Sequence, residues 1–225
     1  MINLKRWVVI AVSTLLFSFA VQAEVVYKID FTDQKGTATD WFKKNEFTFQ
    51  NDAKKVNARF EGGALVLEAN DINGIFTKNL DIKNASKIRI VWGVIHYPQG
   101  ANWEKGVFRE AVGVVVSFGK EKISSGSMVV PNVPYFLALF LGETEKEGKA
   151  YLGNYFKQGG RYFCQPCQNQ TGKTVVTEFD LSSKFKEQFS KNTVPPISSI
   201  TIEVDSRDTK GVSKAFIKSI ELLSE

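Results

Sequence analysis

Alternating apolar residues near the end of the chain constrain its fold most strongly. In the segment 197–205, apolar residues stand at every second position: Ile200, Ile202 and Val204. A period of two is typical of a strand with one buried face. A polar turn over 206–211 follows, and the apolar segment 215–222 alternates less regularly, which predicts a bulged strand. We expect the two strands to form a hairpin in an antiparallel all-β domain.

The first residues have the pattern of an export signal. Lys5 and Arg6 precede the apolar run 7–20, and the small residues around Ala23 suit signal peptidase. The run is shorter than the roughly 20 apolar residues that span a bilayer, so a membrane anchor is the weaker alternative. The pattern predicts a signal peptide over 1–23, a single domain over 24–225, no membrane span after cleavage, and a periplasmic or secreted location.

The charges of the chain do not indicate a nucleic-acid partner. The net charge is +5, from 29 Lys and Arg against 24 Asp and Glu. The basic residues are scattered among acidic ones rather than gathered on one predicted element, and binding to nucleic acid is therefore not expected.

Further segments with a period of two, joined by turn residues, raise the expected number of strands to about ten. The segment 58–69 predicts a hairpin turning at Gly62-Gly63, and 111–118 is apolar on both faces, as in a central strand. The aromatic segment 41–49 is interpreted as a strand with a bent entry. Leu181, Phe185 and Phe189 instead follow helical spacing, which predicts a helix over Ser182–Phe189 capped by Asp180 or Ser182.

These elements predict an all-β fold. The expected architecture is a two-sheet antiparallel β-sandwich of jelly-roll, galactose-binding-like type with one short helix. A closed barrel is the alternative.

The two cysteines, Cys164 and Cys167, lie close together in the sequence. In an oxidising compartment such a pair predicts a local disulfide. A c-type haem is excluded because Gln168 stands where a His is required. A redox-active pair is the remaining alternative, although the surrounding segment has no βαβ pattern.

A series of short motifs runs along the mature chain. They are Asp30-Phe31, Trp41, Trp92 followed by Pro98-Gln99-Gly100-Ala101, Ser117-Phe118-Gly119, Phe179-Asp180-Leu181 and the segment from Asp205 to Gly211. In this order they resemble the secreted bacterial family called domain of unknown function 3047. The resemblance implies a β-sandwich similar to those of carbohydrate-binding modules and implies no particular activity. Arg207 and the cysteine pair depart from the family pattern.

A calcium site is one candidate at the closing turn. Asp205 and Asp208 flank this turn, and Asp30 on the first strand could supply a third oxygen ligand. The alternative is that these carboxylates accept hydrogen bonds from turn amides. No cofactor is predicted, and a structural Ca²⁺ at this turn is the alternative.

Two kinds of ligand site are also considered. Loop aromatics could stack on sugar rings, and the candidate binding residues are Trp92, Trp103, Tyr155, Tyr162 and Arg109. The segment from Tyr155 to Gly159, with His96 and Tyr162, resembles part of the alginate-lyase jelly rolls. That resemblance implies His96, Tyr162 and Lys157 as catalytic residues.

We therefore expect a non-catalytic exported protein that binds carbohydrate or an envelope partner. A polysaccharide lyase is the alternative from another functional class. A structural envelope protein without a small ligand is the second alternative.

Overall fold

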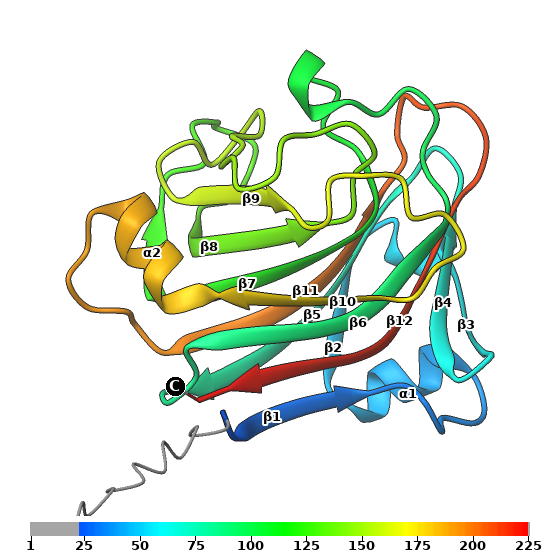
Figure 1. The fold of residues 1–225 in the computed structure, drawn as a ribbon, viewed down its shortest axis with the longest axis horizontal. Helices are drawn as coiled ribbons and strands as arrows, with labels where there is room; N and C mark the ends of the chain where they lie inside the picture. The colour runs from blue at the N-terminus through cyan, green and yellow to red at the C-terminus, as the bar shows by residue number, and fades with distance from the viewer. Residues whose placement is uncertain (1–22, 225) are drawn as a thin grey trace, which may run out of the picture.

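The computed structural model describes residues 23–224. Residues 1–22 lie outside the described residues, and with them nearly all of the predicted signal peptide. Two six-stranded sheets pack face to face, so the predicted β-sandwich is confirmed (Figure 1). None of the helices among residues 23–224 combines the length and the apolar composition needed to cross a bilayer.

The first sheet, sheet A, has the strand order β10-β6-β12-β4-β3, and β1 pairs with β12. All of its described pairs are antiparallel. Its strands are β1 (Val25–Asp30), β3 (Asn57–Glu61), β4 (Ala64–Ala69), β6 (Lys87–His96), β10 (Val175–Asp180) and β12 (Ser213–Leu223).

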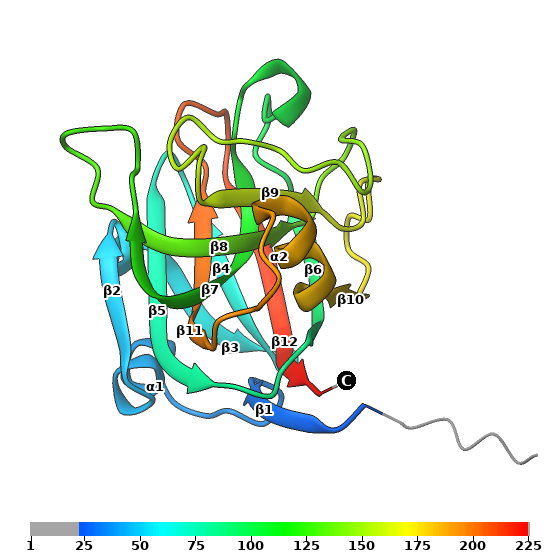
Figure 2. The same ribbon diagram turned by 90° about the vertical axis from the view of Figure 1, so that its left-hand side faces the viewer.

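The second sheet, sheet B, has the strand order β2-β5-β11-β7-β8-β9 (Figure 2). Its described pairs are antiparallel except β8 with β9, which run parallel. Its strands are β2 (Phe47–Asn51), β5 (Asn73–Ile82), β7 (Glu110–Ile123), β8 (Val133–Phe140), β9 (Gly160–Cys164) and β11 (Ile197–Asp205). The predicted central strand, β7, is paired on both sides.

The predicted closing hairpin is wrong, although both of its strands exist. β11 pairs with β5 and β7 in sheet B, whereas β12 pairs with β4, β6 and β1 in sheet A. The turn between them crosses from one sheet to the other. Each strand buries alternate residues against the same core from opposite sides, so the alternation is equally compatible with both arrangements. The expected bulge in β12 is confirmed between Ile217 and Ser219.

One continuous core fills the space between the sheets. Its fully buried side chains come from both sheets and include Leu65, Ile88, Trp92, Val114, Leu137, Ile202 and Ile220. Burial of alternate residues on facing strands is what joins the two layers.

Two α-helices lie at the periphery of the sandwich. α2 (Leu181–Phe189) confirms the predicted helix, and the Asp180 carboxylate accepts a hydrogen bond from the Ser183 amide at 2.8 Å. α1 (Ala38–Lys44) covers the first part of the segment 41–49, where a bent strand is predicted, so that part of the prediction is wrong, whereas Phe47 and Phe49 do lie in the strand β2. Short 3-10 helices span Ala53–Lys55 (η1) and Trp103–Lys105 (η2).

Candidate functional site

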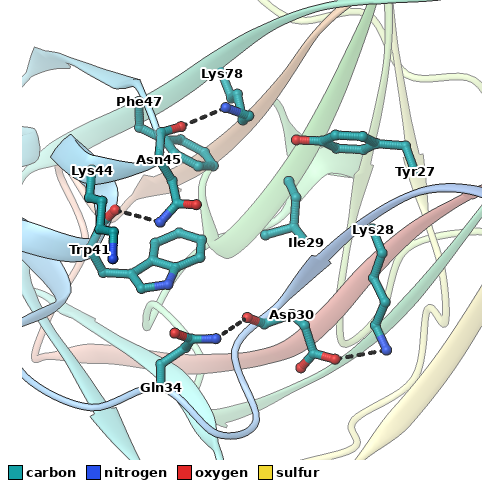
Figure 3. A pocket seen from close by; sticks show the side chains of 10 residues that line it. All are labelled: Tyr27, Lys28, Ile29, Asp30, Gln34, Trp41, Lys44, Asn45, Phe47 and Lys78. Atoms are coloured by element: carbon teal, nitrogen blue, oxygen red, sulfur yellow. Dashed lines mark hydrogen bonds and ion pairs between the residues drawn. The ribbon is translucent and has the colours of Figure 1, made fainter.

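A pocket of about 350 Å³ opens at the edge of the sandwich where β1 of sheet A faces α1, β2 and β5 (Figure 3). This volume lies in the range of small-molecule sites, which begins near 300 Å³. Its walls are formed by Tyr27, Lys28, Ile29, Asp30, Gln34, Trp41, Lys44, Asn45, Phe47 and Lys78.

The sequence of α1 positions one wall of the pocket. Thr37 caps the helix, and its hydroxyl accepts a hydrogen bond from the Asp40 amide at 3.1 Å while donating to the Asp40 carboxylate at 2.7 Å. The helix then directs Trp41 against Phe31, with ring centroids 5.0 Å apart. The Asn45 side-chain amide donates to the Trp41 carbonyl at 2.9 Å and closes the C-terminal end of the helix.

The opposite wall belongs to β1. Ile29 pairs with Ile220 of β12 and is buried, which anchors the strand. Tyr27, two residues earlier on the same strand, lies at the edge of the pocket. Figure 3 shows the Tyr27 hydroxyl directed into the space between the two walls. Burial raises the pKa of this hydroxyl, which therefore stays protonated and able to donate.

One ion pair and two hydrogen bonds to backbone carbonyls hold the polar rim of the pocket in place. Lys28 and Asp30 form an ion pair at 2.7 Å, and the Asp30 carbonyl accepts a hydrogen bond from the Gln34 side chain at 3.0 Å. Burial raises the pKa of Asp30, but the Lys28 ion pair and the Thr32 hydrogen bonds outweigh it and lower the pKa to about 2. The Lys78 ammonium donates to the Asn45 carbonyl at 2.6 Å.

Several donors in the pocket are free to bind a ligand. Within residues 23–224, the Tyr27 hydroxyl, the Trp41 indole N–H and the Lys44 ammonium have no hydrogen-bond partner. The pocket therefore combines three aromatic side chains, those of Tyr27, Trp41 and Phe47, with uncommitted donors and one uncommitted positive charge.

Two tryptophans predicted to bind a ligand are buried. Trp92 is 0% exposed, and its indole N–H donates to Thr177 at 2.9 Å inside the main core. Trp103 is 4% exposed and stacks on Phe140, with ring centroids 4.5 Å apart, in a second, smaller aromatic cluster. Neither ring presents a face to solvent, so neither tryptophan is placed to stack on a sugar at the surface.

The other predicted binding residues do not converge on the pocket. Tyr162 packs on Trp103 at 4.8 Å between ring centroids, and Tyr155 is exposed on the loop before β9. Arg109 is engaged by the Arg207 carbonyl at 2.7 Å and the Asp208 carboxylate at 2.8 Å. None of the three lines the described pocket.

The residues of the lyase alternative are not assembled into one site. His96 is exposed at the end of β6 in sheet A, whereas Tyr162 belongs to β9 in sheet B and Lys157 to an exposed loop. No contact joins His96 to either of the others in the described part of the chain. The lyase mechanism thus lacks the geometry that general acid–base catalysis requires.

The three aspartates of the calcium hypothesis do not come together. Across residues 23–224, no group of three or more His, Cys, Asp or Glu side chains is arranged to hold a metal ion. Asp30 is paired with Lys28, and Asp205 accepts two hydrogen bonds from the Arg207 guanidinium at 3.0 and 2.7 Å.

The two cysteines form the predicted local disulfide, which joins Cys164 to Cys167.

Trp41 and Tyr27 were missed as candidate site residues. The signal that could have located Trp41 was the segment Thr37-Ala38-Thr39-Asp40, because Thr followed three residues later by an acidic residue resembles a capping box. That pattern predicts a helix, instead of a bent strand, at the start of this segment. No comparable signal marks Tyr27, whose place depends on the pairing of β1 with β12.

No model of a protein family matches the chain, and no curated protein matches its sequence. The resemblance to the domain of unknown function 3047 therefore stays a prediction. Similar solved structures include the carbohydrate recognition domain of Emp47p, with a TM-score of 0.45 and 10% identity, covering 92% of this chain and 99% of that chain. A mutant of CBM29-2, a family 29 carbohydrate binding module, has a TM-score of 0.38 and 9% identity, covering 90% and 93%. At these TM-scores the similarity does not identify a ligand.

Proposed function

We propose that this chain is an exported protein that binds a saccharide in the pocket between β1 and α1. The observation that carries the proposal is a 350 Å³ space walled by Tyr27 and Trp41 and lined by uncommitted hydrogen-bond donors. Export is supported by Lys5, Arg6 and the apolar run that follows them.

Saccharides need two kinds of contact, and the pocket has both. Their apolar C–H faces pack on aromatic rings, while their hydroxyl groups need donors and acceptors at fixed positions. Trp41 is held by Phe31, Phe42 and Phe60, with centroid distances of 5.0 to 6.0 Å, so its ring is already in place. Such preorganisation reduces the entropy lost on binding.

The experiment is a glycan array followed by isothermal titration calorimetry with the best ligand. We expect Tyr27→Phe, which removes one hydroxyl group, and Lys44→Gln, which removes one charge, each to weaken binding by about tenfold. Both substitutions leave the core untouched, because neither deleted group has a partner within residues 23–224.

The matched control is Lys43→Gln. Lys43 is the exposed neighbour of Lys44 on α1 but does not line the pocket. Its substitution should leave the affinity unchanged. Absence of binding to every glycan, or equal effects of Lys43→Gln and Lys44→Gln, would contradict the proposal.

A further inference from the structure

A second polar site lies on the outer face of sheet B, away from the core. On β11, Ile202 and Val204 are fully buried, so Glu203 between them projects outward. On β7, Val112 and Val114 are fully buried, and Gly113 faces outward opposite Glu203.

A register shift brings another carboxyl group to this face. Between Glu203 and Asp205 the pairing of β11 with β7 slips, so that Asp205 faces Glu110 instead of Ala111. Bulges of this kind redirect side chains and are common beside active sites. The Glu110 side chain extends over Gly113: a Cβ placed on Gly113 would lie 3.6 Å from Glu110 Cγ and 4.0 Å from its Oε1. Gly113 thus leaves room for Glu110 beside Glu203.

Glu110 has the surroundings of a neutral acid. It is 7% exposed, and in the described part of the chain its Oε2 has no hydrogen-bond partner. A buried carboxylate without partners is strongly unfavourable, whereas the protonated form carries no charge. Burial, followed by the charges of Glu203 and Asp205, raises the pKa of Glu110 well above its usual value despite Arg109 and Arg207.

Glu203 is suited to remain the charged partner. It is more exposed than Glu110, and its Oε1 accepts a hydrogen bond at 3.0 Å from the buried Asn73 side chain. Asn73 is oriented in turn by a hydrogen bond from Asn51. Burial and the Asp205 charge raise the pKa of Glu203 above its usual value, and the Asn73 hydrogen bond offsets only part of this rise. Two neighbouring carboxyl groups with different surroundings can divide the roles of acid and base.

The surface around the pair presents groups that suit a sugar chain. Thr77 and Thr201 share a hydrogen bond at 2.9 Å, and Thr201 lies two residues from Glu203 on the same face of β11. Tyr162 projects outward from β9 but packs on Trp103, with ring centroids 4.8 Å apart, and burial raises the pKa of its hydroxyl well above the usual value. The threonine hydroxyls are therefore the groups beside the pair that suit the hydroxyls of a sugar.

We propose that Glu110 and Glu203 form a glycoside-hydrolysing site on the outer face of sheet B, with Glu110 as the acid and Glu203 as the base. The pair supplies the two groups that hydrolysis of an acetal needs, a proton donor for the leaving oxygen and a carboxylate that activates water. This site is separate from the pocket between β1 and α1, so either can exist without the other.

The atoms of the reaction balance without a further reactant. Glu110 transfers its proton to the glycosidic oxygen as the C–O bond breaks, and the electron pair of that bond stays on the oxygen. Glu203 takes a proton from a water molecule whose oxygen forms the new bond to the anomeric carbon. Solvent returns the proton from Glu203 to Glu110. The net reaction converts one glycoside and one water into two hydroxyl compounds.

The experiment measures release of reducing ends from laminarin, xylan, hyaluronan and alginate across a range of pH. We expect release from at least one of them, with a bell-shaped pH profile set by Glu110 and Glu203. The charged and titratable groups that face this pair are Asp205, Arg109, Arg207 and Tyr162. Glu110→Gln and Glu203→Gln should each lower the rate by about 100-fold or more. Glu110→Gln replaces a neutral acid by a neutral amide, so the variant is expected to fold.

Glu121→Gln is the matched control, because Glu121 is an exposed residue on the same strand, β7. Its rate should equal that of the unmodified protein, and circular dichroism should show all three variants folded. No release from any of the four polysaccharides would overturn the proposal. Release that survives in folded Glu110→Gln and Glu203→Gln would overturn it as well.

Discussion

Two aromatic clusters, each centred on a tryptophan outside the strands, have opposite relations to solvent. Trp103 stacks on Phe140 and is 4% exposed, and its indole N–H donates to the Arg109 carbonyl at 3.2 Å. Trp41 also contacts an aromatic ring, that of Phe31 at 5.0 Å between ring centroids, yet it lines the 350 Å³ pocket and its indole N–H has no partner within residues 23–224. Both clusters are rich in aromatic contacts, so the number of such contacts does not distinguish core from site.

What distinguishes the two clusters is the state of their polar groups. The loop that carries Trp103 is held by the buried Glu145 carboxylate, which accepts hydrogen bonds from the amides of Trp103, Glu143 and Thr144 at 2.9 to 3.1 Å. The backbone amide and the indole N–H of Trp103 are therefore both engaged. Around Trp41, donors remain available. A satisfied tryptophan contributes stability, whereas one with an unused donor beside a pocket can contribute binding.

The largest expected effect is the loss of stability in Trp103→Ala. Truncating this buried tryptophan should lower the free energy of unfolding by about 4 kcal/mol, because it leaves a cavity among Phe140, Tyr151 and Tyr162. Trp41→Ala should cost about 2 kcal/mol, since that ring is already partly exposed. Urea denaturation of the two variants measures the difference. Equal losses would mean that the two clusters share one structural role.

A smaller effect is expected for Glu145→Gln. The substitution replaces one carboxylate oxygen by an amide NH₂ group, which donates hydrogen bonds and cannot accept those of the backbone amides, and the cost should be about 2 kcal/mol. Little space exists for another arrangement, because a Cβ on Gly142 would lie 2.3 Å from Glu145 Oε2. The control is Glu147→Gln, an exposed residue of the same loop. Urea denaturation showing the same stability for both variants would contradict the role given to Glu145.

The sequence predicted the sandwich because alternation depends on local pattern alone. Ile200, Ile202 and Val204 do face the core, and α2 begins after Asp180 as expected. The partners of each strand did not follow from the pattern, which is why β11 and β12 were wrongly joined in a hairpin. The sites were less predictable still. The pocket depends on Tyr27 of β1 lying next to α1. The position of Glu110 near Glu203 depends on a register shift between β11 and β7, and no residue type in the sequence marks that shift.

The smallest expected effect tests whether α1 acts as a support for the Trp41 cluster. Thr37→Ala removes the cap hydrogen bond to the Asp40 amide and should lower the free energy of unfolding by about 1 kcal/mol. Fraying of a helix that is only seven residues long should also displace Trp41 and Lys44, so saccharide affinity should fall in parallel. Thr39→Ala is the matched control, because Thr39 is exposed on the same helix and alanine is the better helix former. Calorimetric titration and urea denaturation of both variants separate the two consequences. An affinity unchanged in Thr37→Ala would mean that the pocket wall is held by the packing of Trp41 on Phe31 and Phe60, and that the cap serves stability alone.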